Sequence, residues 1–167
     1  ADAARIYCNR YGVKAGERIV VITSHDSAYQ AALDLKAADV ESVVIADLRA
    51  YAESPWLTAA RKAKIPVLHG VRVHRTKGKR HIASVDVTYT DANGMQHRQS
   101  LDCDALLMCG GWIPAVHLFS QSRGKLRFDD TLGAFVPGIS VQHEHFAGAC
   151  NAAFSLEAAP HEGADAR

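Results

Sequence analysis

Several residues that could bind a nucleotide come directly after predicted buried strands. Asp47 ends the apolar run 42–47, and Gly110 and Gly111 follow the apolar run 104–109. In dinucleotide-binding folds an acid at the end of the second strand binds a ribose, although acids at strand ends also serve as turn or capping residues. Glycines after a strand let a ligand approach the backbone, or serve only a tight turn. Asp47, Gly110 and Gly111 are therefore candidate cofactor-binding residues.

The loop after the first predicted strand lacks the glycines of a phosphate-binding turn. Residues 23–28 read Thr-Ser-His-Asp-Ser-Ala, whereas a dinucleotide fold has G-x-G-x-x-G there, so that the backbone can approach a pyrophosphate. Asp26 or Ser27 is expected to cap the following helix, and Asp26 sets a negative charge where a phosphate would lie. The sequence predicts a Rossmann-like scaffold without a phosphate cradle.

The sequence offers no set of residues for acid-base or metal chemistry. No histidine has an evident nucleophile or carboxylate partner, so no catalytic residue is predicted. His143 and His145 are expected on one face of a strand, but no third ligand is near in sequence, so no metal site is predicted. The four cysteines are scattered without a C-x-x-C motif, which argues against zinc or disulfides.

Hydrophobic periodicity predicts the elements that position these residues. The first part of the chain is expected to form a helix over 3–11, a strand over 18–23, a helix over 28–38, a strand over 42–47, a helix over 55–64 and a short parallel strand over 65–69 that ends at Gly70. Alternating segments then predict a three-stranded antiparallel meander over 71–74, 82–89 and 95–101, with a turn at Asn93-Gly94.

The rest of the chain is expected to return to the sheet and then leave it. We predict strands over 104–109, 125–129 and 139–147, a turn at Pro137-Gly138, and a helix over 152–159 that Pro160 ends or kinks. The predicted fold class is α/β: a three-layer Rossmann-like domain that combines a short parallel sheet with a three-stranded antiparallel β-meander.

The composition is that of a globular protein with a core of its own. The 167 residues are 48% apolar and 22% charged, with a net charge of +1. This balance predicts neither a nucleic-acid partner nor a membrane partner, and we expect a cytoplasmic protein. The chain does not begin with methionine and stops just after a helical pattern, from which we expect a piece of a longer polypeptide.

Particular stretches of the chain resemble the alpha subunits of the heterotetrameric sarcosine oxidase family. The most specific is Gly-Gly-Trp-Ile-Pro-Ala-Val-His-Leu-Phe-Ser-Gln at 110–121. The other similar stretches are 7–13, 23–29, 123–126 and 147–156. Together they cover nearly the whole chain but only the middle part of such a subunit. The order of elements is also similar to the second, nested nucleotide-binding domain of disulfide-reductase-like flavoproteins.

The resemblance implies a part in the oxidative demethylation of sarcosine to glycine and hydrogen peroxide, with one-carbon transfer to tetrahydrofolate. It implies that FAD and sarcosine belong to the beta subunit, while the alpha subunit holds NAD and lies against an FMN at the subunit interface. The NAD-binding loop would precede this segment, and a folate-binding domain would follow it. The chain would then be a scaffold that closes over cofactors, with the remainder of the alpha subunit and the other subunits as its partners.

The resemblance also divides the chain and adds candidate residues. Residues 1–147 would be the nested NAD(P)-binding-like domain, and 148–167 the segment that returns to a first nucleotide-binding domain. In the superfamily this return carries a Gly-Asp pair that touches the nucleotide. Here Gly148 is followed by Ala149, so the carboxylate contact is lost while backbone groups remain available. These two residues and Trp112 complete the candidate cofactor contacts.

Other functions stay open on the sequence alone. The Rossmann-like order and Asp47 favour an autonomous NAD(P)-dependent oxidoreductase, which the missing glycines oppose. A loop centred on Trp112 would also suit an interaction module that binds a partner protein. A subunit of an opine oxidase or cyanide synthase resembles the 110–121 motif more weakly.

Overall fold

The computed structural model describes residues 1–51 and 53–165, which divide into two compact units. The first unit is Ala1–Gly111 and the second is Trp112–Arg167. The predicted division at 147/148 concerns a longer protein and stays a prediction.

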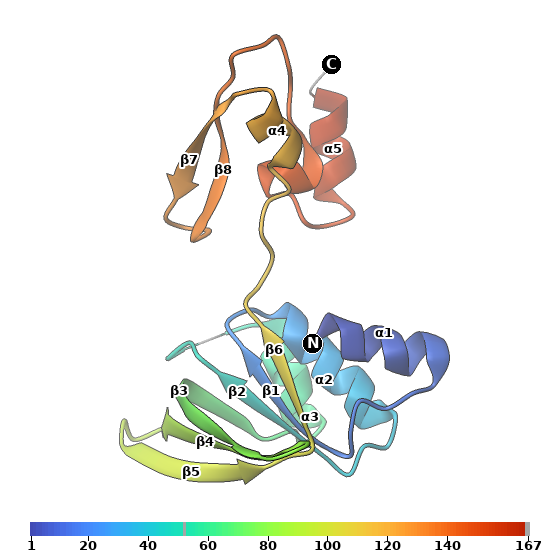
Figure 1. The fold of residues 1–167 in the computed structure, drawn as a ribbon, viewed down its shortest axis with the longest axis vertical. Helices are drawn as coiled ribbons and strands as arrows, with labels where there is room; N and C mark the ends of the chain where they lie inside the picture. The colour runs from blue at the N-terminus through green and yellow to red at the C-terminus, as the bar shows by residue number, and fades with distance from the viewer. Residues whose placement is uncertain (52, 166–167) are drawn as a thin grey trace. The chain divides into compact units, whose positions relative to one another are not determined.

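The first unit is built on one mixed sheet in the order β5-β4-β3-β2-β1-β6 (Figure 1). Its strands are β1 (Arg18–Thr23), β2 (Ser42–Asp47), β3 (Val67–Gly78), β4 (Ile82–Thr90), β5 (Gln96–Asp102) and β6 (Ala105–Cys109). β1 pairs in parallel with both β2 and β6, and β2 pairs in parallel with the start of β3. The β3, β4 and β5 strands are antiparallel to one another, as the predicted meander requires.

The described residues of this unit form three helices, which are α1 (Asp2–Tyr11), α2 (Ser27–Ala37) and α3 (Pro55–Lys62). α1 ends at Gly12, whose φ of 63° is the left-handed conformation of a helix C-cap. α3 begins at Pro55. Ser54 caps it, because the Ser54 hydroxyl accepts a hydrogen bond from the Leu57 amide at 3.2 Å. The three predicted helices are confirmed, with ends shifted by up to two residues.

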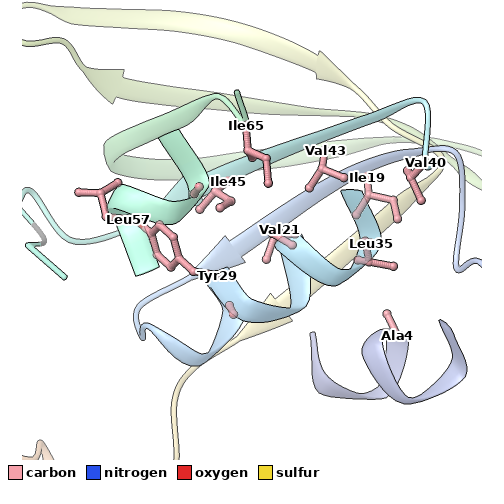
Figure 2. Packing of buried hydrophobic residues seen from close by; sticks show 13 residues of the cluster. Ala4, Ile19, Val21, Tyr29, Leu35, Val40, Val43, Ile45, Leu57 and Ile65 are labelled. Atoms are coloured by element: carbon pink, nitrogen blue, oxygen red, sulfur yellow. The ribbon is translucent and has the colours of Figure 1, made fainter. Parts of the chain in front are cut away.

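Two apolar clusters cover the two faces of the sheet, and β1 contributes to both. Ile19 and Val21 pack with α2 and α3, as Figure 2 shows. Val20 and Ile22 pack on the other face against residues of the meander, including Val85. Because both faces are covered, β1 is a continuous apolar run rather than an alternating one. The helices pack on one face of the parallel strands, and the meander, which continues the same sheet, packs on the other face.

One predicted boundary in this unit is wrong. The short parallel strand over 65–69 and the first meander strand are one strand, β3, which pairs with β2 at Val67 and Leu68 and with β4 from His69 onward. Gly70 lies at the change of partner with a φ of 60°, and the register shifts between His69 and Arg72. An irregularity of this kind bends a strand without ending it, so glycine here marks a bulge rather than a stop.

The second unit contains α4 (His117–Gln121), β7 (Lys125–Asp129), β8 (Ala134–Ile139), the 3-10 helix η1 (Gly148–Asn151) and α5 (Ala158–Asp165). β7 and β8 form a two-stranded antiparallel sheet. The predicted strand over 125–129 is confirmed, whereas the turn at Pro137-Gly138 is wrong because both residues lie inside β8. The turn between the strands is formed earlier, where the Asp129 carboxylate accepts hydrogen bonds from the Thr131 and Leu132 amides.

The predicted strand over 139–147 is also wrong, since β8 ends at Ile139. The Ser140 hydroxyl donates to the Gln142 carbonyl and the Glu144 carboxylate, at 2.9 and 2.8 Å, and these local bonds fold the segment into bends. Side-chain bonds to nearby groups compete with strand pairing in this way. His143 and His145 therefore lie outside any strand.

The predicted helix over 152–159 is wrong as well. η1 ends before Ala152, whose φ is 66°, and α5 begins only at Ala158. The Ser155 hydroxyl accepts a hydrogen bond from the Ala158 amide at the start of α5. Pro160 lies in the first turn of this helix, where its missing N–H has no intrahelical partner to lose. Pro160 therefore neither ends nor kinks this helix, which continues to Asp165.

Candidate functional site

The carboxyl ends of the parallel strands bring three candidate segments to one edge of the first unit. Thr23 at the end of β1 is in register with Asp47 of β2 on one side and with Cys109 of β6 on the other. The Ser24 amide donates to the Cys109 carbonyl at 3.1 Å. The β1–α2 loop, Asp47 and the glycines after β6 therefore meet at the sheet edge where ligands of open α/β folds bind.

Asp47 is completely buried, and both of its oxygens are occupied. Oδ1 accepts hydrogen bonds from the backbone amide and Nε of Arg49, at 2.9 and 3.0 Å. Oδ2 accepts from the Tyr29 hydroxyl at 2.7 Å and from Nη2 of Arg49 at 2.8 Å. A ribose hydroxyl reaches this carboxylate only if Arg49 or Tyr29 moves. The ribose role of Asp47 stays a prediction, and the geometry is that of the alternative turn residue.

The surroundings of Asp47 keep its carboxylate charged. Burial by itself raises the pKa of Asp47, but the hydrogen bonds from Arg49 and Tyr29 outweigh burial and lower the pKa below its ordinary value. Burial and the hydrogen bond to Asp47 raise the pKa of Tyr29 far above 10. Neither group changes its charge near neutral pH, so this cluster holds the structure together rather than moving protons.

Asp26 lies in the β1–α2 loop and pairs with Arg49. It takes the N-cap position of α2, but its Oδ1 accepts from Nη2 of Arg49 at 2.7 Å instead of from a helix amide. The predicted side-chain cap is therefore wrong for Asp26. The loop is held by Thr23, whose hydroxyl accepts from the His25 amide at 2.9 Å and donates to the His25 carbonyl at 2.7 Å.

Sequence reasoning missed Arg49 and the contacts between the loop and β6. Arg49 follows the strand-end acid by two residues, and this Asp-x-Arg spacing is the signal that could have identified it. The Ser27 hydroxyl lies 3.2 Å from His25 Nδ1 and 3.6 Å from the Cys109 sulfur, which fastens the loop to the end of β6. Within residues 1–51 and 53–165, no three His, Cys, Asp or Glu side chains cluster as metal ligands would.

The glycines after β6 leave space beside the backbone. Gly111 has a φ of 98°, and a Cβ placed there would lie 3.5 Å from the His25 side chain. At Gly110, no heavy atom of the described chain other than those of Gly110 and its two sequence neighbours comes within 4 Å of the position that a Cβ would take. The backbone at Gly110 is thus open to a ligand or a partner, whereas Asp47 is not.

The remaining candidate residues lie in the second unit. Trp112 and Ala149 line a groove of about 390 Å³ together with the apolar side chains of Ile113, Ala153, Phe154, Leu156 and Ala159. Trp112 is 52% exposed, and its ring lies 6.3 Å from that of Phe154. The Gly148 amide is already satisfied, because it donates to the Glu162 carboxylate at 3.0 Å. The structure thus brings Trp112 and Ala149 together around one apolar groove.

The fold is that of known disulfide reductases. The thioredoxin reductase of T. acidophilum matches with a TM-score of 0.56 and 21% identity, over 95% of this chain and 55% of that chain. A bacillithiol disulfide reductase from Staphylococcus aureus matches with a TM-score of 0.63 and 18% identity, over 89% of this chain and 48% of that one. At such identities the likeness shows the fold alone. It confirms the predicted Rossmann-like α/β class.

By sequence, the chain is similar to a segment of sarcosine oxidase alpha subunits, which confirms the predicted resemblance. It is 36% identical over 167 residues to the subunit of Corynebacterium sp. strain P-1 and 33% identical over 164 residues to that of Rhizobium meliloti strain 1021. Each match covers 98% of this chain, but only 17% and 16% of those curated relatives. No family model matches the chain.

No helix within residues 1–51 and 53–165 combines the length and the apolar character needed to cross a membrane.

Proposed function

We propose that this chain is a scaffold segment of the alpha subunit of a sarcosine-oxidising enzyme. The single observation that carries the proposal is the 36% identity to a sarcosine oxidase alpha subunit, which extends over 98% of this chain. The reaction of the whole enzyme is the oxidative demethylation of sarcosine to glycine and hydrogen peroxide, with the one-carbon unit passed to tetrahydrofolate. The segment itself supplies no catalytic group.

The geometry of the sheet edge supports a scaffold role rather than an independent nucleotide site. The β1–α2 loop contains no glycine, and its acid is paired with Arg49. Asp47 spends its hydrogen-bonding capacity inside the chain. A sheet edge that binds a nucleotide needs free backbone amides and an accessible acid. Here Asp47 binds Arg49, which in turn binds Asp26 of the β1–α2 loop, so the acid holds the loop in place instead.

The open glycines and the apolar groove are the places where cofactors or partners held elsewhere approach this segment. We propose that NAD is held mainly by another domain of the alpha subunit, that FMN lies at a subunit interface, and that FAD belongs to a partner subunit. FMN supplies electron-transfer chemistry when bound. Gly110 and Gly111 let a ligand approach the backbone closely, while Trp112 and Ala149 offer an apolar surface. The amide of Gly148 is bound to Glu162, so this glycine supplies only the positive φ of 68° that the chain adopts there.

The proposal is tested on the longer polypeptide that carries this segment, purified with its partner subunits. The measurements are sarcosine-dependent oxygen consumption and the content of NAD, FMN and FAD. We expect the unchanged enzyme to oxidise sarcosine. We expect the Gly110→Val variant, whose side chain fills the space beside the backbone, to contain less FMN. Oxidation of an opine instead of sarcosine contradicts the proposal, as does NAD(P)H oxidation by the 167-residue chain alone.

A further inference from the structure

Arg49 is a guanidinium shared by two carboxylates of different accessibility. Its Nε and Nη2 bind the two oxygens of Asp47, at 3.0 and 2.8 Å, and Nη2 also binds Asp26 at 2.7 Å. The Asp47 side chain is completely buried, whereas the side chains of Asp26 and Arg49 are each 32% exposed. The inner carboxylate therefore fixes the direction of the guanidinium, and the outer one lies within reach of solvent.

A guanidinium held in this way is a ready acceptor for an oxyanion. A bidentate partner orients the fork, so a second anion binds without further ordering of the side chain. In dinucleotide-binding folds an arginine near the end of the second strand accommodates a phosphate on the ribose, and the loop after the first strand receives the pyrophosphate. Here that loop sends a carboxylate, Asp26, to the arginine instead.

We propose that Asp26 is an internal substitute for phosphate: it fills the anion site that Arg49 forms at the end of β2 and keeps phosphorylated nucleosides out. This inference deepens the scaffold role proposed above and rests on it. The cluster holds two carboxylates and one guanidinium. A phosphate monoester carries a charge near −2. It would be repelled by the excess negative charge of the cluster, and Nη2 of Arg49 is already bound to both carboxylates. The Asp26 side chain alone therefore prevents a phosphate from binding to Arg49.

The test removes the charge of Asp26 while keeping its shape. Adenosine 2′-phosphate is titrated into the full 167-residue chain and into its Asp26→Asn variant by calorimetry at low ionic strength, with adenosine and inorganic phosphate as companion ligands. We expect Asp26→Asn to lower the dissociation constant of adenosine 2′-phosphate at least tenfold, which is about 1.4 kcal/mol. Adenosine is expected to show no change.

Two further variants make the result specific. Asp34, on the same helix, accepts from Arg5 Nε at 2.9 Å, so Asp34→Asn removes an equal charge from a similar ion pair elsewhere. It is expected to leave affinity unchanged. Adding Arg49→Gln to Asp26→Asn is expected to abolish the gain. Should Asp26→Asn fail to fold, Asp26→Ser removes the charge while keeping a residue favoured at a helix N-cap.

Three results overturn the inference. They are equal affinity of the folded wild-type and Asp26 variant chains, an equal gain in Asp34→Asn, and tight binding of adenosine 2′-phosphate by the unchanged chain. None of these measurements involves sarcosine or the assembled enzyme. A failure here is therefore distinguishable from a failure of the proposed function.

Discussion

Removing the Tyr29 hydroxyl tests the buried cluster around Asp47 most sharply. Tyr29 and Asp47 are both fully buried and share a hydrogen bond of 2.7 Å. A hydrogen bond to a charged group contributes about 1.5–3 kcal/mol, and Tyr29→Phe leaves the bonds from Arg49 in place. We therefore expect Tyr29→Phe to lower the free energy of unfolding of the first unit by about 2 kcal/mol at neutral pH.

The pH dependence gives this prediction a second signature. The pKa of Tyr29 is raised in the folded chain above its ordinary 10.0, so the stabilisation from its phenol is complete below pH 10 and is lost as the pH rises further. The phenylalanine variant has no such group. The stability difference between wild type and variant is therefore expected to narrow above pH 10. A lowered pKa of Asp47 has the opposite sense, with stabilisation complete above about pH 3.8 and lost below it.

The assay follows the first unit alone. The chain has two tryptophans, Trp56 in α3 and Trp112 in the second unit, so a Trp112→Phe background makes fluorescence report only on the first. Urea unfolding is measured in this background with and without Tyr29→Phe. Tyr11→Phe, at a residue 60% exposed on α1, is the matched control and should change little. A loss below about 0.5 kcal/mol, or an unchanged difference above pH 10, refutes the reasoning.

Three further substitutions test other features of the first unit by the same urea assay. Leu35→Ala empties a fully buried position and should cost about 2–5 kcal/mol, whereas Leu48→Ala, at a residue 44% exposed, should cost much less; equal costs contradict the described core. Gly78→Ala places a Cβ against the His81 carbonyl oxygen at a φ of 140°, so most of the folded population should be lost, and a urea unfolding curve like that of the wild type argues against this turn. Ser54→Ala removes the cap of α3 and should cost about 1 kcal/mol; no loss means that the cap is not formed.

Most of the first unit was predictable because its signals are local. The run at 18–23 is continuously apolar, because both faces of the sheet are covered, and the helix after it is periodic over its whole length. The error at β3 came from Gly70, because a glycine in a sequence can mark either a bulge within a strand or the end of the strand. Only the structure, where the φ of Gly70 is 60°, distinguishes the two. Strand types were therefore predictable and one strand boundary was not.

The second unit was less predictable because several of its apolar residues, unlike Phe119 and Val136, are not buried within it. Ile139 is 69% exposed and Val141 is 65% exposed, yet both contributed to the strand predicted over 139–147. Hydrophobic pattern predicts structure through burial, so it misleads where the apolar side chains stay accessible. The bends at 140–144 follow instead from the side chains of Ser140 and Glu144.

The candidate site was only partly predictable for a related reason. Each of Asp47, Gly110 and Gly111 was recognisable as following a predicted strand, and the strand order places them at one sheet edge. Arg49 and Asp26 are 23 positions apart in the chain, and no local sequence pattern predicts that they pair. Whether an acid is free or satisfied depends on such contacts, and they distinguish a nucleotide-binding residue from a structural one.

The most direct test of the scaffold account is a calorimetric titration of NAD into the 167-residue chain, with Asp47→Ala as the companion variant. The account predicts no saturable heat at millimolar NAD for either protein, because the acid and the loop of the sheet edge are engaged within the chain. Saturable binding by the unchanged chain that disappears in Asp47→Ala would contradict it and make this domain a nucleotide site in its own right.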